Sequence, residues 1–341
     1  MLLTGCSNDE SSPAESTGSA TDDKVVIITS LKPFALMIDE AYGDFVESSY
    51  LVPPEQSPHH VTLRPSAVNR LRSADLLIWA GPELESFLPG LLSRFGFEHV
   101  DAASNTSSTE RRLQLAALEV LPAALLVEYG KSGLSDDQQT ELPPGAHAHA
   151  LGSVDPHFWL SLAAVEALLV RIEQIIVRLH LGDVSGRSAQ GETLQKQLSG
   201  SRQAFMDRLK RSFPASGSAI VDSFPLVYSY HPAFNYLLRE LGIPDEGYLT
   251  RNPESGVPPS AIAAFLETAA ENEICMLAEP QYTLPVERLM AKLAGGAKKA
   301  SRTVVADPLG VEADSFSDLY AGVRKALRAC LGAQARPESD S

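Results

Sequence analysis

The chain has 341 residues, of which 44% are hydrophobic, so it can bury a large core and is long enough to prefer two lobes over one. Its formal net charge of −15 argues against a surface that binds nucleic-acid phosphates, so we expect no nucleic-acid partner. No apolar run reaches the length of about 18 residues that a membrane-spanning helix needs.

The start of the chain carries a motif that predicts a lipid anchor. Residues 3–6 read Leu-Thr-Gly-Cys, which matches the processing box of bacterial lipoproteins, so we expect Cys6 to be lipidated. Residues 7–23 are rich in Ser, Asp, Glu and Thr and cannot form a core. We therefore interpret residues 1–23 as a lipobox remnant and a disordered tether. Because almost no sequence precedes the box, we expect that the leader was trimmed or that the start was assigned too late.

Strands and helices alternate after the tether in the way that predicts a parallel α/β sheet. The predicted strands here are 24–30, 46–52 and 76–80, and the predicted helices are 34–42 and 65–73. Residues 131–153 are rich in Ser, Gly, Asp, Pro and His and predict a long, flexible exposed loop.

Two consecutive helices are predicted in the middle of the chain. Residues 163–180 have an apolar stripe with the helical period of 3.6 residues. Residues 188–213 have a sparser stripe, which suits a helix that connects two lobes. Strand–helix alternation then resumes, with strands predicted at 219–222, 274–278 and 303–306 and helices at 231–241, 262–272, 285–293 and 316–331.

These elements predict an α/β protein of two lobes, each a mostly parallel sheet flanked by helices, with a long α-helix joining them. We assign residues 24–184 to an N-terminal lobe, 185–213 to the linker helix, 214–332 to a C-terminal lobe and 333–341 to a disordered tail. Ligands of open α/β sheets bind beyond the carboxyl ends of the strands, so we expect the site in the cleft between the lobes.

Three histidines in three separate segments stand beside prolines: His59, His157 and His231. Proline fixes its own φ and disfavours helix at the residue before it, so each imidazole is expected to sit in a stiff loop. Asp307 follows a predicted strand and also precedes a proline. Three imidazoles and one oxygen make a tetrahedral zinc site, and these four residues are the predicted ligands. The alternative is four ordinary loop residues.

Other histidines are weaker candidates as auxiliary metal ligands. His60 adjoins His59, while His147 and His149 form a His-x-His pair in the predicted loop that could capture metal loosely. An enzyme is disfavoured, because the chain has no His-Glu-x-x-His helix and no Gly-x-Ser-x-Gly elbow. Four protein ligands would also leave a zinc ion no open position for catalysis.

Cys275 and Cys330 are the remaining cysteines. An exported protein meets an oxidising compartment, which favours a disulfide between them. The loop that such a bond closes would contribute about 4 kcal/mol on the chain-entropy account. The alternative is two buried free thiols.

The motifs together resemble a known family, the zinc-binding subclass of the metal-specific solute-binding lipoproteins of bacterial ABC transporters. That group also contains manganese binders and proteins once called adhesins. The matching segments appear in family order from about residue 24 to residue 332 and are TSLKP (29–33), LVPPEQSPH (51–59), LRPS (63–66), ADLLIWAGPE (74–83), DPHFWLS (155–161), YHPAF (230–234), AEPQ (278–281) and DPLG (307–310).

The resemblance implies two lobes joined by one long rigid helix, with the metal in the cleft. By position, His59, His157 and His231 match the family's three histidine ligands, and Asp307 matches the aspartate that supplies, or stands near, a fourth position. It also implies a disulfide between Cys275 and Cys330. Manganese-type members carry a carboxylate at the position of His231, and a nitrogen ligand there favours zinc.

The function that the resemblance implies is a non-catalytic zinc receptor on the periplasmic or cell-surface side of the cytoplasmic membrane. It would capture Zn²⁺ as transported ligand and deliver it to an ABC transporter permease and its ATPase. We expect a monomer that touches the membrane only through the lipid on Cys6. Zinc affinity should fall as pH drops through the histidine range, because the ligands must be deprotonated.

One region departs from the family pattern. Many zinc members carry a long loop rich in His and Asp before the second ligand, and here that loop is reduced to His147-Ala-His149. We therefore do not expect this loop to scavenge metal. A manganese or ferrous iron receptor, a surface adhesin and, less favoured, a zinc hydrolase are the alternative functions.

Overall fold

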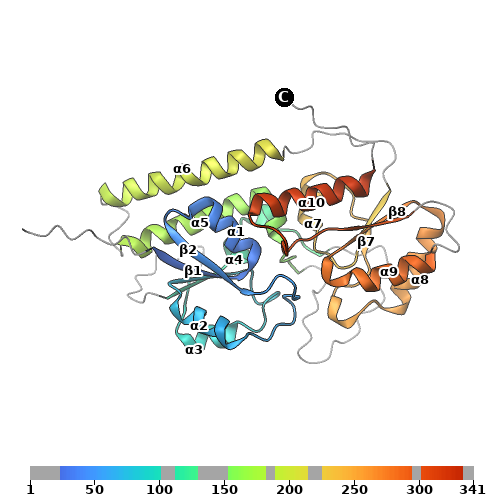
Figure 1. The fold of residues 1–341 in the computed structure, drawn as a ribbon, viewed down its shortest axis with the longest axis horizontal. Coiled ribbons are helices and arrows are strands. Elements are labelled where there is room, and N and C mark those ends of the chain that lie inside the picture. Colours follow the sequence, from blue (N-terminus) through green and yellow to red (C-terminus); the bar gives the residue numbers. More distant parts are fainter. Residues whose placement is uncertain are drawn as a thin grey trace, which may run out of the picture.

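The computed structural model describes residues 24–100, 112–129, 153–181, 189–213, 225–293 and 301–332. The predictions for the lipobox and tether, most of the loop at 131–153, the strand at 219–222 and the tail fall outside these residues. Figure 1 shows two α/β lobes beside each other, with two long helices along one side of the molecule. The predicted fold class is confirmed, whereas the domain boundaries stay a prediction.

The N-terminal lobe contains a five-stranded sheet in the order β2-β1-β3-β5-β4, in which each neighbouring pair is parallel. Its strands are β1 (Val25–Leu31), β2 (Val46–Val52), β3 (Leu76–Trp79), β4 (Glu98–His99) and β5 (Leu113–Ala116). β1 and β3 are almost continuously apolar because strands inside a parallel sheet are covered on both faces. β4 and β5 were not predicted; both are short, and they form the edge of the sheet opposite β2.

The helices of this lobe begin and end where the sequence provides start and stop residues. They are α1 (Lys32–Tyr42), α2 (Pro65–Ser73), α3 (Pro89–Phe95), α4 (Ala117–Val120) and α5 (Leu162–Leu181). Pro65 and Pro89 each occupy a first helical position, where the missing N–H is not needed. Gly96 ends α3 with φ of 68°, a left-handed conformation that glycine adopts at no steric cost.

The C-terminal lobe contains a second parallel sheet, in the order β7-β6-β8-β9. Its strands are β6 (Leu226–Ser229), β7 (Gly247–Tyr248), β8 (Ile274–Ala278) and β9 (Arg302–Val305). Its helices are α7 (Asn235–Glu240), α8 (Pro259–Glu271), α9 (Thr283–Leu293) and α10 (Phe316–Leu331). The strand predicted at 274–278 and the helix predicted at 316–331 are confirmed at both ends.

The segment around His231 differs from the prediction. Residues 226–229 form β6, which was not predicted, and the helix that was predicted from His231 begins at Asn235. Pro232 explains the late start, because proline disfavours the helical conformation of the residue before it. His231 therefore sits in the bend that directly follows the strand.

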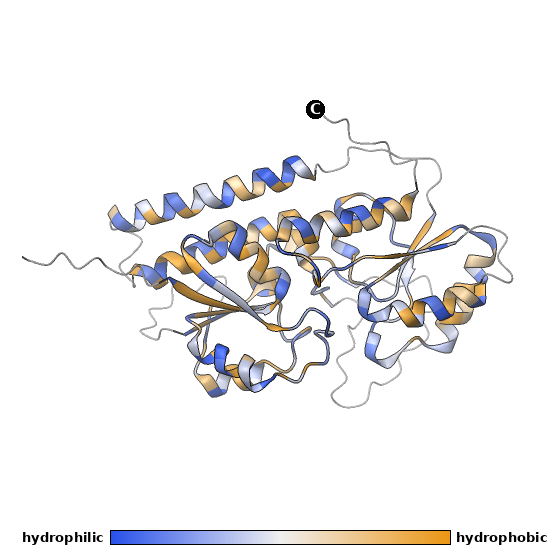
Figure 2. Cartoon of the chain, in the orientation of Figure 1, coloured by the Kyte–Doolittle hydropathy of each residue, from blue (hydrophilic) through white to orange (hydrophobic). Residues whose placement is uncertain are grey.

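The long helix α6 (Ala189–Ser212) connects the two lobes and packs on both. A buried carboxylate on α5, Glu173, accepts hydrogen bonds from Ser199 at 2.5 Å and from Arg202 at 2.9 Å on α6. About one turn further along α6, the ring of Phe205 lies 6.2 Å from that of Phe316 on α10. In Figure 2 polar residues recur along α6, whereas the strands of both sheets are mainly apolar. The helix α6 thus contacts helices of both lobes and can connect them.

The implied disulfide is confirmed. Cys275 in β8 is bonded to Cys330 near the end of α10, and both residues are fully buried. The bond joins β8, an inner strand of the C-terminal sheet, to α10, which packs beside the sheet. Among the described residues, none of the helices combines the length and the apolar character that crossing a membrane requires.

Candidate metal centre

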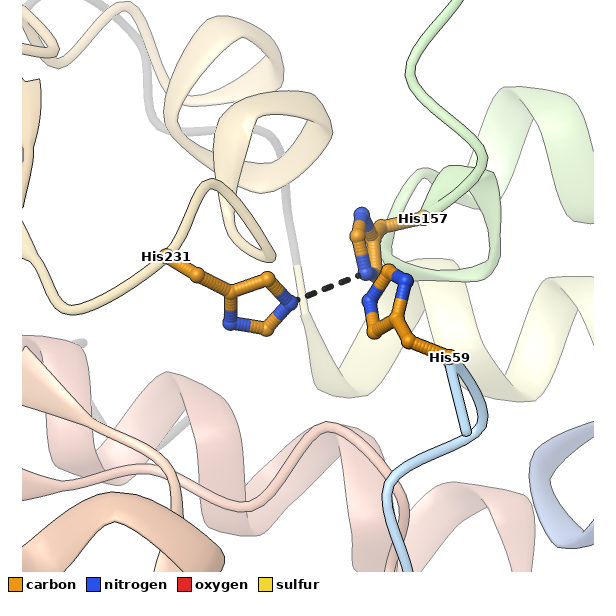
Figure 3. A group of neighbouring side chains, drawn as sticks. All are labelled: His59, His157 and His231. Atoms are coloured by element: carbon orange, nitrogen blue, oxygen red, sulfur yellow. Dashed lines mark hydrogen bonds between the residues drawn. The ribbon is translucent and has the colours of Figure 1, made fainter. Parts of the chain in front are cut away.

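The three proline-flanked histidines come from three different parts of the fold and meet between the lobes. His59 lies in the loop between β2 and α2, and His157 stands just before the short 3₁₀ helix at Phe158–Leu160 that leads into α5. His231 lies in the bend after β6. Figure 3 shows the His231 ring facing the rings of His157 and His59, which approach from the other lobe.

The distances among these rings are those of a metal-ligand cluster. One nitrogen from each histidine can be chosen so that all three lie within 4.8 Å of one another. The ring centroids are 5.8 Å apart for His59 and His157, 5.5 Å for His59 and His231, and 5.0 Å for His157 and His231. One ion between the rings could therefore contact all three.

A buried carboxylate lies behind each of two rings. The Oδ1 atom of Asp155 is 2.7 Å from Nδ1 of His157 and also accepts the backbone N–H of His157 at 2.9 Å. The Oε1 atom of Glu279 is 2.6 Å from Nδ1 of His231. Asp155 is 0% and Glu279 2% exposed, so both carboxylates are removed from water. A carboxylate only accepts hydrogen bonds, so the hydrogen bond with Asp155 places the proton of a neutral His157 ring on Nδ1, and the negative charge of Glu279 beside Nδ1 of His231 favours the same tautomer there.

The consequence is that two nitrogen lone pairs point at each other. With their protons on Nδ1, both His157 and His231 present an unprotonated Nε2, and these two atoms are only 3.2 Å apart (Figure 3). Facing lone pairs repel unless a proton or a metal ion lies between them. Two zinc–nitrogen bonds of normal length in a tetrahedral site would separate the nitrogens by about 3.3 Å. The geometry thus fits a tetrahedral metal ion bound through both Nε2 atoms.

The rings line a pocket with walls from both lobes. Among the residues around it are Ser57, Trp159, Tyr282 and Leu309. Trp159 donates its indole N–H to the carbonyl of Pro308 at 2.8 Å, so the two sides of the pocket are in direct contact. Burial raises the pKa of the Tyr282 hydroxyl well above its usual range, although a hydrogen bond with Ser57 opposes that rise. The tyrosine therefore stays neutral and supplies no negative charge to the site.

Asp307 is placed differently from the three histidines. Its carboxylate accepts three backbone N–H groups, from Leu309 at 3.0 Å, Gly310 at 2.9 Å and Val311 at 2.6 Å. It is not a member of the metal-ligand cluster found among the described residues. In this structure Asp307 fixes the conformation of the turn after β9 through these hydrogen bonds. Two residues of that turn, Pro308 and Leu309, form part of the pocket wall.

Of the auxiliary candidates, His60 alone lies among the described residues. His60 is exposed and does not belong to the group of converging nitrogens. His147, His149 and Cys6 lie outside the described residues, so their predicted roles stay predictions.

No role was predicted for Asp155 or Glu279, although both lie in the segments that carry the family resemblance. Glu279 directly follows the fully buried strand β8 and precedes a proline, the same arrangement that singled out Asp307. That signal could have found Glu279. Asp155 stands two residues before His157, where its side chain can reach both the backbone and the ring of that histidine.

This chain is similar over most of its length to known proteins of zinc uptake. The family model described as zinc-uptake complex component A, periplasmic, matches residues 27–330. The high-affinity zinc uptake system protein ZnuA of Yersinia pestis is 27% identical over 310 residues, covering 89% of this chain and 91% of that protein. The protein of the same name from Paracoccus denitrificans is 26% identical over 314 residues, covering 90% and 92%.

Solved structures show the same fold. A crystal structure of ZnuA aligns with a TM-score of 0.62 at 20% identity and covers 91% of this chain and 100% of that one. The periplasmic zinc binding protein TroA from Treponema pallidum aligns with a TM-score of 0.57 at 18% identity, covering 91% and 99%. The family model spans both lobes and all three converging histidines. This chain therefore belongs to the family of periplasmic zinc-uptake complex components A.

Proposed function

We propose that this protein is a high-affinity zinc receptor that captures Zn²⁺ in the periplasm and delivers it to the permease of an ABC transporter, which its ATPase drives. The ion is bound by His59, His157 and His231 and is the cargo, not a resident cofactor. The protein acts as a receptor and not as an enzyme, as the uptake-complex family to which it belongs indicates.

The observation that carries this proposal is the pair of Nε2 atoms of His157 and His231, 3.2 Å apart with a buried carboxylate behind each ring. Burying two carboxylates without compensating positive charge is costly. A divalent cation bound to the Nε2 atoms of the two imidazoles supplies positive charge on the far side of each ring, which compensates the negative charge of the carboxylates. The carboxylates in turn make the imidazoles better donors to the ion.

The three nitrogen ligands favour zinc over manganese. Imidazole suits zinc, whereas manganese prefers carboxylate, carbonyl and water oxygens. A manganese-bound periplasmic metal binding protein from candidatus liberibacter asiaticus has the same fold, with a TM-score of 0.62 at 14% identity. Because likeness at that identity reflects the fold alone, the ligand set decides between the two metals.

Zinc should stabilise the folded protein strongly and manganese only slightly. Free zinc at about 1,000 times its Kd adds about 4 kcal/mol to the free energy of unfolding, which raises Tm by roughly 6 °C for a chain of 341 residues. Differential scanning fluorimetry with each metal, after removal of bound metal with a chelator, measures the two shifts. Equal shifts for the two metals would contradict the zinc assignment, and no shift with zinc would contradict the receptor.

We further propose that solvent completes the coordination of the ion and that Asp307 has a structural role. Asp307→Ala removes the acceptor of three backbone N–H groups, so apo-protein stability should fall by about 1–3 kcal/mol. The zinc stoichiometry should remain one, and X-ray absorption should still detect three nitrogen neighbours. If Asp307→Ala lowers zinc affinity as much as His59→Ala does, the aspartate is a ligand and this assignment is wrong.

The lipid on Cys6 and the monomeric state belong to the same proposal. A receptor that must meet a membrane permease gains from an anchor, and residues 7–23 have the composition of a tether that would let it move. The division into lobes at 24–184 and 214–332 around a linker at 185–213 accords with the two separate sheets and the helix α6 between them.

A further inference from the structure

The three histidines are not held equally firmly. His157 is 2% and His231 5% exposed, and each has a buried carboxylate at its Nδ1 atom. His59 is partly exposed and lies in the irregular segment 53–64 between β2 and α2. His157 adjoins the 3₁₀ helix at Phe158–Leu160, and His231 stands two residues after β6. His59 is six residues from the nearest helix or strand, so its backbone opens at lower free energy. His59 is therefore the ligand whose departure requires the least rearrangement.

The loop of His59 is fastened to the other lobe by the residues that follow Glu279. The side-chain amide of Gln281 donates to the carbonyl of Pro54 at 2.8 Å, across the cleft. The hydroxyl of Tyr282 donates to Glu254 of its own lobe at 3.1 Å and also interacts with Ser57, whose hydroxyl accepts the backbone N–H of His59 at 3.4 Å. Two contacts thus join one short segment of the C-terminal lobe to the loop that carries the third ligand.

The same segment also touches the ligand on its own side of the cleft. Glu279 lies at the Nδ1 atom of His231, and the ring of Tyr282 packs edge-on against the ring of His231 with centroids 5.8 Å apart. The ring of Tyr282 is in turn stacked on Tyr230, at 4.8 Å. Residues 279–282 are therefore held in place by the C-terminal lobe, and from there they can bind the loop of His59.

We propose that Gln281 and Tyr282 form a latch that positions His59 over the bound ion and sets the rate at which zinc leaves. This inference rests on the proposed function, because it assumes that zinc is held by the three histidines. Opening of the latch frees the loop of His59 while His157 and His231 keep their places. The ion is then left with two imidazoles and an exposed side from which it can be passed on.

Other contacts between the lobes explain why the remaining two ligands stay together. The hydroxyl of Tyr236, on α7, donates to the carbonyl of Asp155 at 2.9 Å, and the indole of Trp159 donates to the carbonyl of Pro308 at 2.8 Å. These bonds flank His157 in the sequence and join its segment to the C-terminal lobe that carries His231. They do not involve the loop of His59, so opening of the latch leaves them intact.

Stopped-flow kinetics on the full chain tests the latch. Mixing zinc-loaded protein with excess EDTA measures the dissociation rate, and mixing apo-protein with zinc measures the association rate. The reporter is the fluorescence of Trp159, whose ring lies 5.4 Å from that of His157. Loss of one hydrogen bond of about 1 kcal/mol should raise the zinc dissociation rate of Gln281→Ala about fivefold and leave the association rate unchanged. Tyr282→Phe, which removes only the hydroxyl, should act in the same direction.

Arg239→Ala is the matched control. Arg239 also donates from its side chain to carbonyls of the other lobe, at 2.8 Å to Leu126 and 3.3 Å to Ala124, but away from the loop of His59. Its dissociation rate should stay within about twofold of wild type. The latch is wrong if Gln281→Ala and Tyr282→Phe both release zinc at the wild-type rate, or if Arg239→Ala accelerates release equally. If wild-type protein binds no zinc, the receptor function itself is wrong, which is a separate result.

Discussion

His231→Ala should weaken zinc binding at least about 100-fold, since loss of a residue that only supports a metal ligand already costs about 10–100-fold. The substitution removes one of the two facing Nε2 donors and leaves the buried Glu279 beside an empty space. Neither the remaining imidazoles nor solvent can restore a nitrogen at that position. Competition against a chromophoric zinc chelator measures the change in Kd.

His60→Ala is the control for this substitution. His60 is the same residue type, adjoins the ligand His59 and is exposed, and it lies outside the cluster of converging nitrogens. Its replacement should change the Kd for zinc by less than about twofold, as expected of a surface substitution. Similar losses for His60→Ala and His231→Ala would mean that the cluster is not the zinc site.

The double substitution Cys275→Ala with Cys330→Ala should lower the free energy of unfolding by about 4 kcal/mol. The disulfide closes a loop between residues separated by 55 positions, and both residues are fully buried. Urea unfolding of the metal-free double variant and of wild-type protein, both under non-reducing conditions, measures the difference.

Zinc affinity should change much less than stability in this double variant, because neither cysteine lines the pocket. Wild-type protein unfolded in the presence of a reducing agent provides a second comparison, since it loses the cross-link and keeps the sulfur atoms. If the double variant and wild-type protein unfold at the same urea concentration, the disulfide does not contribute in solution.

The elements that could be predicted from the sequence are those with strong local signals. α2 starts at a proline that occupies its first turn, and β8 is an apolar run between polar residues. β4, β5 and β7 are two to four residues long, too short for a periodic pattern to stand out. α7 was expected to begin at His231 but begins at Asn235, because Pro232 disfavours the helical conformation of the residue before it.

Some features of the candidate site could likewise be predicted from the sequence, and others could not. Prolines beside His59, His157 and His231 indicated stiff loops at the ends of elements, and the fold brings these loops together. The distance between Glu279 and His231 could not be read from the sequence, because it depends on how β6 and β8 pair in the sheet. The placement of Asp307 depends on the turn that follows it, whose three N–H groups point at its carboxylate.

The most direct test of whether the three histidines share one zinc ion is anomalous X-ray scattering, measured above and below the zinc edge from crystals of the zinc-loaded protein. A shared ion predicts one strong peak between the lobes, about 2.0–2.1 Å from Nε2 of His157, from Nε2 of His231 and from a ring nitrogen of His59. The account is contradicted if the space between these rings holds no anomalous peak while zinc is found bound elsewhere on the chain.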